Sequence, residues 1–278
     1  MPDADGTYPV DICFITRDIT GASTKTNVLP TLARCYEMLR ASPRLQWVHA
    51  HSAGLDRPIY AELQARGVRV TSSAGANAVP VAHTAVAAVL ALGRQFPLQI
   101  AAQHKRQYLP LTNHPERHDL CGQTALVLGL GAIGSRIARY LAALDLNVVG
   151  IGRSNFAELE SHLPHIDYLV LACPLNEQTT RLVDSALLGK MRRGSYLVNV
   201  ARGEVCVELD VIAALQSGQL AAAFLDGFEI EPLSADSKLW DLPNVMLSAH
   251  TAGHFTGHAD AVVKIFIEHL TEFVRTRA

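Results

Sequence analysis

The segment Thr124–Ser154, TALVLGLGAIGSRIARYLAALDLNVVGIGRS, decides the fold. An apolar run leads into Gly129-x-Gly131-x-x-Gly134, an amphipathic stretch follows, and a second apolar run closes the segment. This order predicts a strand, a glycine turn, a helix and a second strand, the unit that binds a dinucleotide at the positive end of its helix. Gly129 permits the tight turn, Gly131 lets the backbone approach a pyrophosphate, and Gly134 lets the helix pack closely. The residues expected to bind the cofactor here are Gly129, Gly131, Ala132, Ile133 and Gly134.

The end of the second strand indicates which nicotinamide dinucleotide binds. An acidic residue usually stands there and accepts hydrogen bonds from the adenosine ribose. Here the strand ends in Gly152, Arg153 and Ser154, which leaves room for a 2′-phosphate and supplies a guanidinium and a hydroxyl to bind it. The sequence therefore predicts NADP as the preferred cofactor, with NAD possible. The alternative is that Arg153 is a solvated surface residue.

Apolar strand-like runs alternate with helix-period segments along almost the whole chain, which predicts an α/β fold of doubly wound parallel sheets. The chain has 278 residues, of which 49% are hydrophobic, so two packed domains are the default. A first small sheet is predicted from three apolar runs, at residues 10–15, 45–50 and 68–72. A long apolar helix from Val79 marks the domain boundary, and Pro97 should kink or end it. The polar stretch 103–119 has the composition of a connection.

Charge and cysteine content exclude several classes of protein. The formal charge is -2, so nothing favours binding to nucleic acid or to an anionic membrane. The five cysteines lack CxxC spacing and are odd in number, which predicts reduced thiols, a cytoplasmic protein and no metal site. The polar, acidic N-terminus predicts no signal peptide, and the apolar stretches are interrupted before the ~20 residues that a membrane span needs.

Four later apolar runs each break into a loop with polar or small residues. In a doubly wound sheet the ligand crevice lies beyond the carboxyl ends of the strands, so residues far apart in sequence can meet there. We expect one site to contain the residues that follow these four runs, namely Cys173, Arg202, Asp226, Glu231 and His250.

The motifs VLGLGAIG, ACPLNEQTTRLVD, NVARGEVCVELDVIAAL, FLDGFEIEPL and SAHTAG resemble those of the D-isomer-specific 2-hydroxyacid dehydrogenases, in that family's order and spacing. SAGLD and AGANAVPVAH are similar to the family's substrate loop and inter-domain helix. The resemblance runs from about Val10 to the C-terminus and implies two Rossmann-like domains with the active site in the cleft between them. It also implies that the C-terminal helix returns to the first domain. The expected domains are a substrate domain, shortened at its N-terminus, and a dinucleotide-binding domain, with the respective bounds 1–78 plus 255–278 and 79–254.

The resemblance implies an oxidoreductase that moves a hydride between NAD(P)H and a small 2-oxo or 2-hydroxy acid, similar to a glyoxylate or hydroxypyruvate reductase. It further implies a homodimer formed through the nucleotide domain. Backbone amides of Ala53 and Gly54 would bind the substrate carboxylate. Positions matching the family motifs add further expected cofactor contacts, which are Arg153, Ser154, Cys173, Pro174, Thr179, Val200, Ala201, Asp226 and Gly253.

Three residues would perform the chemistry that the resemblance implies. Arg202 would hold the substrate carboxylate and keto oxygen, because a planar guanidinium makes paired charge-assisted hydrogen bonds. His250 would donate a proton to the carbonyl oxygen, since imidazole titrates near neutrality. Glu231 would bond the other ring nitrogen, fixing the tautomer and favouring the protonated ring. His254 and His258 are expected to lie in a loop or on a helix surface.

Two positions depart from the family's pattern, since His83 stands where an acidic residue is expected and Ala249 stands where proline is usual. A second hypothesis is a nucleotide-sensing binding protein of the same fold that performs no turnover. The shortened first domain favours the sensor, whereas the set of Arg202, Glu231 and His250 favours an enzyme. Another Rossmann enzyme, such as a methyltransferase, is disfavoured by the motifs that follow the glycine turn.

Overall fold

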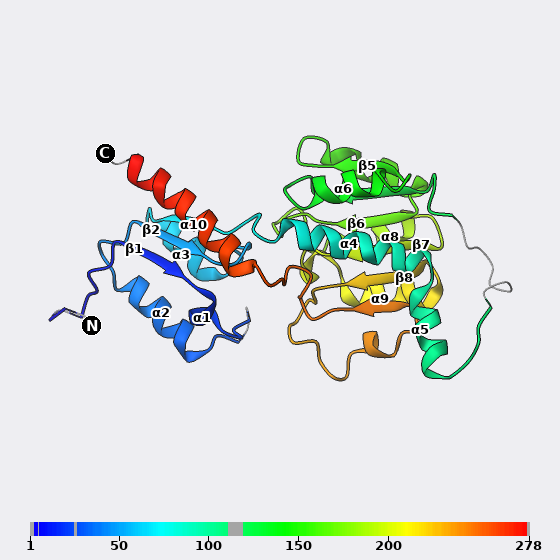
Figure 1. Cartoon of the computed structure of the whole chain (residues 1–278), viewed down its shortest axis with the longest axis horizontal. Helices are drawn as coiled ribbons and strands as arrows, with labels where there is room; N and C mark the ends of the chain where they lie inside the picture. The colour runs from blue at the N-terminus through cyan, green and yellow to red at the C-terminus, as the bar shows by residue number, and fades with distance from the viewer. Residues whose placement is uncertain (1–2, 5, 25–26, 111–118, 277–278) are drawn as a thin grey trace. The chain divides into compact units, whose positions relative to one another are not determined.

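The computed structural model describes residues 3–4, 6–24, 27–110 and 119–276, which fall into two compact units (Figure 1). Unit 1 comprises Met1–Asn77 and His254–Ala278, and unit 2 comprises Ala78–Gly253. Each boundary lies one residue from the expected domain boundary. Of the predicted connection, residues 111–118 lie outside the described part of the chain.

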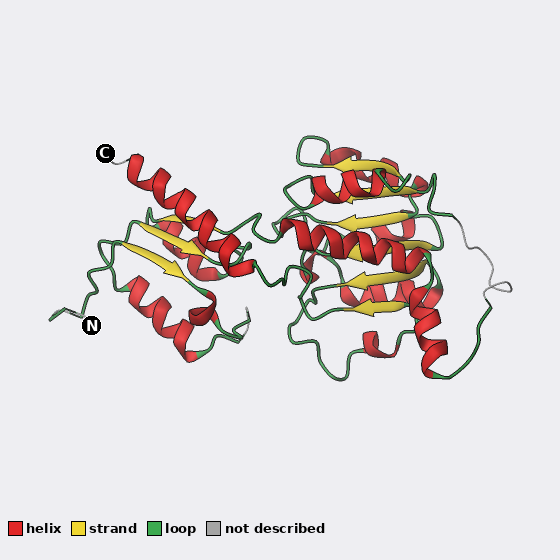
Figure 2. Ribbon diagram, in the orientation of Figure 1, coloured by secondary structure: helices red, strands yellow, loops and turns green. Residues whose placement is uncertain are grey.

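Unit 2 is built on a six-stranded parallel sheet with the order β5-β4-β6-β7-β8-β9 (Figure 2). The strand order reverses beside β4, because β5 pairs with one of its edges and β6 with the other. Ligands of doubly wound sheets bind beyond the carboxyl ends of the strands at such a reversal. The strands are β4 Thr124–Leu128, β5 Asn147–Ile151, β6 Tyr168–Leu171, β7 Ser195–Asn199, β8 Leu220–Leu225 and β9 Val245–Leu247.

Helices cover both faces of this sheet because successive strand residues point to opposite sides. On one side Ala125 and Val127 pack in a core with residues of α4 and α6, and on the other Leu126 and Leu128 pack with residues of α8 and α9. The helices are α4 Ala78–Gly93, α5 Phe96–His104, α6 Gly134–Ala142, α7 Leu159–His162, α8 Ser185–Lys190 and α9 Glu208–Ser217. Short 3-10 helices lie at Phe156–Glu158, Leu163–His165, Gly203–Val205 and Lys238–Asp241.

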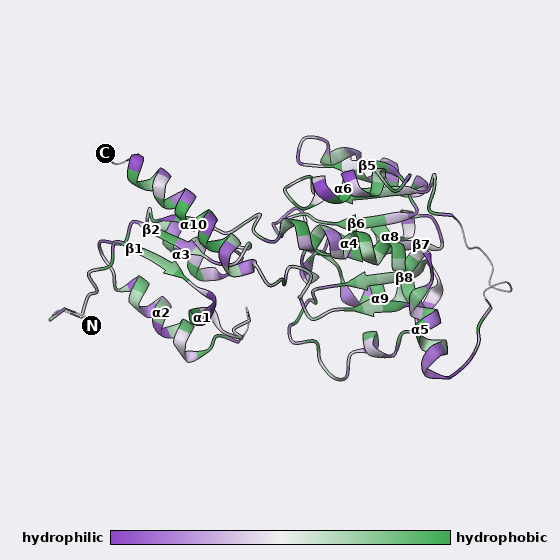
Figure 3. Ribbon diagram, in the orientation of Figure 1, coloured by the Kyte–Doolittle hydropathy of each residue, from purple (hydrophilic) through white to green (hydrophobic). Residues whose placement is uncertain are grey.

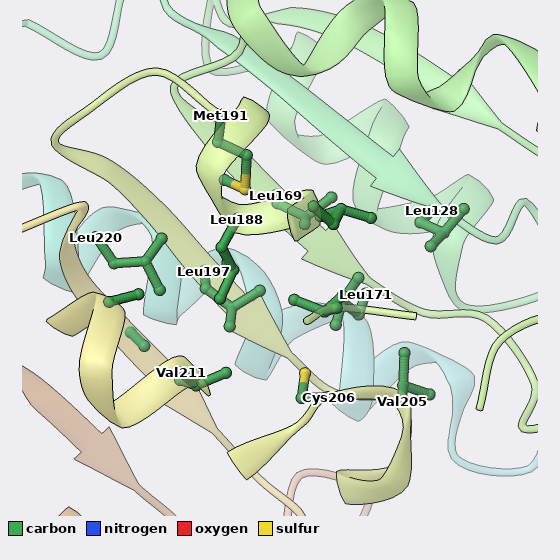
Figure 4. Close-up of a cluster of buried hydrophobic side chains, with 14 of the residues drawn as sticks. Leu128, Leu169, Leu171, Leu188, Met191, Leu197, Val205, Cys206, Val211 and Leu220 are labelled. Carbon is green, nitrogen blue, oxygen red and sulfur yellow. The ribbon is translucent and has the colours of Figure 1, made fainter. Parts of the chain in front are cut away.

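Figure 4 shows part of the core that lies under α8 and α9. Leu171 and Leu197 come from neighbouring strands, while Leu188 and Val211 come from α8 and α9. The strands of unit 2 are hydrophobic along most of their length (Figure 3). Continuous apolar strands are typical of a parallel sheet that is buried on both faces, as the sequence predicts.

The long apolar helix predicted from Val79 is broken near Pro97. Helix α4 ends at Gly93, Gln95 adopts the left-handed region with φ 58°, and α5 begins at Phe96 with Pro97 in its first turn. The expected interruption is confirmed, and the two helices meet at a bend of 70°. Within the described residues no single helix is long and apolar enough to cross a membrane, although α4 and α5 would meet that length and composition if counted together.

Unit 1 contains a three-stranded parallel sheet with the order β1-β2-β3. Helices α2 and α3 cover one face, where Leu32, Leu39 and Leu63 pack against Val48 of the central strand. The elements are β1 Ile12–Ile15, α1 Arg17–Thr20, α2 Pro30–Arg40, β2 Trp47–Ala50, α3 Pro58–Ala65, β3 Arg69–Ser72 and α10 His258–Arg275.

The C-terminal helix α10 packs on this small sheet through aromatic rings. Phe266 stacks on Phe14 of β1 with ring centroids 4.4 Å apart, and Phe273 stacks on Trp47 with centroids 5.1 Å apart. Trp47 is the first residue of β2, whereas Phe14 lies near the end of β1. Helix α10 therefore runs antiparallel to the strands, and its first residue lies toward their carboxyl edge.

Candidate active site

The glycine turn joins β4 to α6 with very little space around two of its glycines. Gly129 has φ +98°, and a Cβ there would lie 2.6 Å from the backbone of Cys173. A Cβ on Gly134 would collide with the carbonyl oxygen of Gly129. Only glycine fits at both positions without a shift of backbone.

Gly131, by contrast, faces open space, since no atom lies within 4 Å of where its Cβ would be. Within the described residues no acceptor bonds the backbone N–H groups of Ala132 and Ile133, which precede the first residue of α6. Free N–H donors at the start of a helix favour an anion. The turn therefore fits the pyrophosphate of a dinucleotide, in the way that the sequence predicts.

The strand next to the turn ends without an acidic residue. Asn155 closes this loop, because its Oδ1 accepts from Gly152 N at 2.8 Å and its Nδ2 donates to the Gly150 carbonyl oxygen at 3.1 Å. The Arg153 and Ser154 side chains are exposed. Among the described residues no carboxylate pairs with the Arg153 guanidinium, so its charge is available to a ligand.

The loop after β6 contains Cys173 and Pro174 and is fixed by a buried threonine. Thr179 is only 3% exposed, and its Oγ1 donates to the Pro174 carbonyl oxygen at 2.7 Å and accepts from Asn176 N at 2.9 Å. Burial raises the pKa of the Cys173 thiol to about 11, so the thiol is neutral near pH 7. These bonds give Thr179 a role inside the loop, and its contact with a cofactor stays a prediction.

The loop after β7 carries Arg202 and is held by Asn199. The Asn199 side chain accepts from Ala201 N at 2.9 Å and donates to the Arg202 carbonyl oxygen at 2.9 Å. The Arg202 guanidinium is half-buried and donates to the Ala201 carbonyl oxygen at 2.7 Å. A Cβ on Gly203 would run into the backbone of Phe228, so the loops after β7 and β8 pack tightly together.

His250 and Glu231 form a hydrogen-bonded pair. The His250 Nδ1 lies 3.0 Å from Glu231 Oε1 and 3.1 Å from Oε2, and Phe228 N donates to Oε1 at 3.2 Å. Gly227 makes room for the pair, because a Cβ there would lie 3.2 Å from Glu231 Oε1. Within the described residues the His250 Nε2 has no hydrogen-bond partner, so it can exchange a proton with a ligand.

Asp226 holds the loop on which His250 lies. This buried carboxylate accepts from Ser248 Oγ and from the backbone N–H groups of Thr251 and Ala252, at 2.8 and 3.0 Å for the latter two. His250 itself has φ 54°, a left-handed conformation that is costly for a residue with a side chain. The bonds to Asp226 on both sides of His250 stabilise that conformation without a proline at position 249.

The surroundings of His250 favour its protonated form. The hydrogen bond to Glu231 is the largest influence and raises the pKa, burial opposes it, and the charge of Glu231 raises the pKa further. The charge of Arg202 lowers the pKa of His250, and the charge of Asp226 raises it. Both groups therefore lie close to His250. The net result is a pKa above the ordinary histidine value, as a proton donor near neutral pH requires.

Most predicted site residues lie in unit 2, at the carboxyl ends of its strands. Val200 and Ala201 are buried beside Arg202, and Gly253 is the last residue of the unit. Ala53 and Gly54 belong to unit 1, in the loop after β2, so their role in binding a substrate stays a prediction.

The other histidines named from the sequence lie on different elements of the fold. His83 packs against Tyr140 of α6, with ring centroids 5.5 Å apart. His254 is exposed in a loop and His258 is the first residue of α10, in agreement with their expected positions.

Sequence reasoning missed residues that shape the site without carrying its chemistry. Asn155, Asn199 and Ser248 each hold a loop through side-chain hydrogen bonds, and Gly227 leaves space for a neighbour. Asn199 and Ser248 stand directly at strand ends, and that position could have identified them. Gly227 offers no such signal, because only the folded chain reveals what lies beside it.

The chain is similar to a known protein family and to several known proteins. A family model described as the NAD binding domain of D-isomer specific 2-hydroxyacid dehydrogenases matches residues 86–252, which lie within unit 2. A glyoxylate reductase of Korarchaeum cryptofilum is 29% identical over 253 residues, covering 86% of this chain and 76% of its own length. A glyoxylate reductase of Thermofilum pendens is 30% identical over 233 residues, covering 78% of this chain and 68% of its own length.

The chain is also similar to a solved structure. A D-isomer specific 2-hydroxyacid dehydrogenase from Xanthobacter autotrophicus Py2, in complex with NADPH and MES, superposes with a TM-score of 0.71 at 30% identity. That alignment covers 82% of this chain and 75% of the other chain. The fold is therefore shared across most of the chain.

Proposed function

The chain belongs to the D-isomer specific 2-hydroxyacid dehydrogenase family, and we propose that it reduces small 2-oxo acids, glyoxylate and hydroxypyruvate among them, with NADPH as the preferred reductant. It is an NAD(P)-dependent oxidoreductase that acts on the CH–OH group of 2-hydroxy acids. The observation that carries the proposed chemistry is the His250 Nδ1–Glu231 Oε1 bond of 3.0 Å beside Arg202, in the unit that the family model matches.

His250 acts as the proton donor in this proposal. Glu231 keeps a proton on Nδ1, so Nε2 is the nitrogen that gives its proton to the substrate's carbonyl oxygen. The bound cofactor supplies the hydride for the carbonyl carbon. In the reverse direction neutral His250 takes the proton from the hydroxyl group, and Glu231 stabilises the imidazolium that forms.

Arg202 binds the carboxylate and carbonyl oxygens of the substrate through its planar guanidinium. Its positive charge also favours the negative charge that grows on the carbonyl oxygen before the proton arrives. The backbone N–H groups of Ala53 and Gly54 are assigned to the substrate carboxylate as well. Among the described residues neither of these N–H groups has an acceptor, which supports the assignment.

The cofactor is held by the glycine turn and by the end of β5. Ala132 and Ile133 offer N–H donors to the pyrophosphate, while Arg153 and Ser154 are assigned to the 2′-phosphate of NADPH. The exposed Arg153 guanidinium supports this choice, as does the NADPH bound to the Xanthobacter autotrophicus relative. Cys173, Pro174, Thr179, Val200, Ala201, Asp226 and Gly253 remain the other proposed cofactor contacts.

We also propose a homodimer formed through unit 2 and a cytoplasmic location. Phe96 and Ile100 of α5 are 52% and 48% exposed, an apolar surface that a second copy would cover. Sedimentation equilibrium measures the assembly, and a monomer at micromolar concentration would contradict the dimer.

The five free cysteines support the proposed cytoplasmic location, because thiols stay reduced in a reducing compartment.

Loss of reduced-nicotinamide absorbance with glyoxylate, hydroxypyruvate and pyruvate tests the activity directly. We expect turnover in the parent and a loss of ~10²-fold or more in kcat for His250→Gln, with cofactor binding near that of the parent. Cofactor binding without turnover of any acid would instead favour a nucleotide sensor. An unchanged rate in His250→Gln would remove His250 as the proton donor.

The cofactor preference has its own test in the double variant Gly152→Asp with Arg153→Ala. A partly exposed charge-assisted contact is worth roughly a ten- to hundredfold preference for NADPH over NADH in kcat/KM. The double variant should reverse that preference, because a carboxylate repels the 2′-phosphate and the attractive guanidinium is gone. A parent that prefers NADH, or a ratio that the two substitutions leave unaltered, would contradict the NADP assignment.

A further inference from the structure

A histidine in the middle of the small sheet of unit 1 is fully buried and takes no part in the proposed reaction. His49 is the third residue of β2 and is 0% exposed. Val48 faces α2 and α3, so His49 points to the opposite face of the sheet, which α10 covers. Its ring centroid lies 5.3 Å from that of Phe14 on β1, and 5.4 Å from those of Phe266 and His269 on α10. His49 therefore lies in the interface between the sheet and the C-terminal helix.

Both ring nitrogens of His49 have hydroxyl partners on the neighbouring strand or directly after it. Nδ1 lies 2.8 Å from Thr71 Oγ1, and Nε2 lies 3.0 Å from Ser73 Oγ. Thr71 Oγ1 also accepts from the Trp47 indole N–H at 2.8 Å, and Ser73 Oγ donates to the Ala50 carbonyl oxygen at 3.3 Å. Because the Ser73 hydroxyl donates to Ala50, it accepts from Nε2–H, which leaves Thr71 to donate to Nδ1. These bonds assign the neutral Nε2–H tautomer to His49.

A protonated His49 does not fit these bonds. Its second proton would lie on Nδ1 and would face the hydrogen that Thr71 Oγ1 donates, so this bond would have to break. The positive charge would also be fully buried, and within the described part of the chain no carboxylate bonds the ring. A buried charge without a charged partner is costly. The interface between the sheet and α10 therefore holds the neutral ring.

The charges that act on His49 oppose its protonation. Burial is the largest influence and lowers the pKa of His49, and the charges of His269 on α10 and of His51, directly after β2, lower it further. The carboxylate of Glu272 on α10 is engaged by Arg69 of β3, at 2.7 Å. The pKa of His49 is about 4 as a result, against an ordinary value of 6.5.

Separation of α10 from the sheet would remove these costs. His269 Nδ1 is buried and, in the part of unit 1 that the structure describes, lacks a hydrogen-bond partner. Once α10 leaves, water reaches both histidine rings, and His49 can take up a proton with its ordinary pKa. The three strands pair with one another and not with α10, so the sheet keeps its backbone hydrogen bonds.

We propose that His49 is an acid-sensitive switch, whose protonation releases α10 from the sheet of unit 1 and exposes Trp47. The docked form has the lowered pKa and the released form the ordinary one, so docking is most stable above about pH 6.5 and weakens as the pH falls toward about 4. In this window the equilibrium constant for release rises about tenfold for each pH unit. The chain passes from unit 2 back to unit 1 between Gly253 and His254, so release frees that connection from its anchor in unit 1.

Hydrogen exchange of the α10 amides measures the release in the full chain. After correction for the intrinsic pH dependence of exchange, the opening constant of α10 should rise about thirtyfold between pH 7.5 and pH 5. The amides of β7 in unit 2 are the internal reference and should stay protected. Equal loss of protection in both elements would mean acid unfolding of the whole chain, and a constant opening of α10 would mean no switch; either result overturns the inference.

Tryptophan fluorescence reports the same event by a second signal. Trp47 is 0% exposed under α10, whereas Trp240, the other tryptophan of the chain, is 54% exposed in unit 2. In a Trp240→Phe background the emission should shift to longer wavelength over the same pH range in which α10 loses protection. Emission that stays constant while α10 opens would contradict the exposure of Trp47.

His49→Gln is the variant that tests the switch itself. Glutamine can bond the same hydroxyls but takes up no proton, so the rise in the opening constant should shrink to about threefold or less. His258→Gln is the matched control, because His258 is the first residue of α10 and burial also lowers its pKa. This control should keep a rise of about tenfold or more. A full rise in His49→Gln, or its loss in His258→Gln alone, would overturn the assignment to His49.

A titration of the parent keeps the inference testable if His49→Gln does not fold. In ¹⁵N NMR spectra of the histidine rings, His49 should carry its proton on Nε2 at pH 7.5, and its second proton should appear together with the loss of α10 protection. A ring that gains its second proton near pH 6.5 while α10 stays protected would overturn the inference, because the docked interface would then accept the charge.

Discussion

Replacement of Glu231 by Gln separates the electrostatic role of this residue from its structural one. Glutamine keeps an oxygen that can accept from Phe228 N, the bond that now measures 3.2 Å to the Glu231 carboxylate. It removes the negative charge that lies 3.0 Å from His250 Nδ1. The substitution therefore changes the protonation of His250 while it preserves the shape of the loop.

The expected magnitude follows from one charge-assisted hydrogen bond. Such bonds contribute about 1.5–3 kcal/mol, and we take the lower end because solvent screens a partly exposed pair. The side chains of His250 and Glu231 are 46% and 29% exposed, which places them in that range. About 1.4 kcal/mol corresponds to about tenfold in the fraction of protonated His250 at a pH above its pKa.

The direction of the pH effect follows from the raised pKa of His250. Reduction requires the protonated ring, so the parent's kcat/KM should fall as the pH rises through that pKa. In Glu231→Gln the fall should begin at lower pH, because the hydrogen bond and charge that raise the pKa are weakened. The loss should reach about tenfold at a pH above the pKa of His250 in both proteins and should shrink as the pH falls and both rings become protonated.

The assay is a pH profile of NADPH oxidation with hydroxypyruvate for the parent, Glu231→Gln and Glu229→Gln. Glu229 lies on the same loop but pairs with Arg181 at 2.8 Å, so its removal should leave the profile unshifted. An equal loss at every pH in Glu231→Gln would mean that Glu231 only supports the loop. A profile identical to that of the parent would refute the coupling of Glu231 to His250.

Three further substitutions probe other parts of the site. Gly134→Ala puts a Cβ against the Gly129 carbonyl oxygen and should cost about 1–3 kcal/mol in urea unfolding, whereas Gly189→Ala, in open space on α8, should cost nothing. Asp226→Asn loses acceptor capacity for three donors, so both Tm and kcat should fall, the latter by about tenfold. Arg202→Lys keeps the charge but loses the planar fork, so KM should rise strongly, and parent kinetics would exclude Arg202 as the anchor.

The parts of the fold that sequence predicts are those encoded by local patterns. The glycine turn, the parallel strands and the interruption near Pro97 each follow from residues close together in the chain. The gathering of the candidate site residues at the strand ends was also predictable, because the topology of a parallel sheet places all its carboxyl ends at one edge. The raised pKa of His250 agrees with the predicted partnership with Glu231.

What sequence does not predict depends on contacts between distant loops. The left-handed conformation of His250 is stabilised by Asp226, which lies on a different loop, and the fit of Gly203 depends on the backbone of Phe228. The hydrogen bonds of the buried Thr179 hydroxyl within its own loop were also not predicted, while its contact with a cofactor stays a prediction. Such contacts form only when the whole unit packs together, so no local pattern in the sequence reveals them.

Proton transfer and substrate binding depend on different residues of unit 2, which gives these residues different kinetic signatures. Proton transfer depends on Glu231 and His250, which are hydrogen-bonded at 3.0 Å. Arg202 is proposed to bind the substrate, and its charge lowers the pKa of His250. Arg202→Lys keeps that charge, so it should raise KM and leave the pH profile where it is, whereas Glu231→Gln should shift the profile for every substrate. If Arg202→Lys moved the profile as Glu231→Gln does, this separation of chemistry from binding would be wrong.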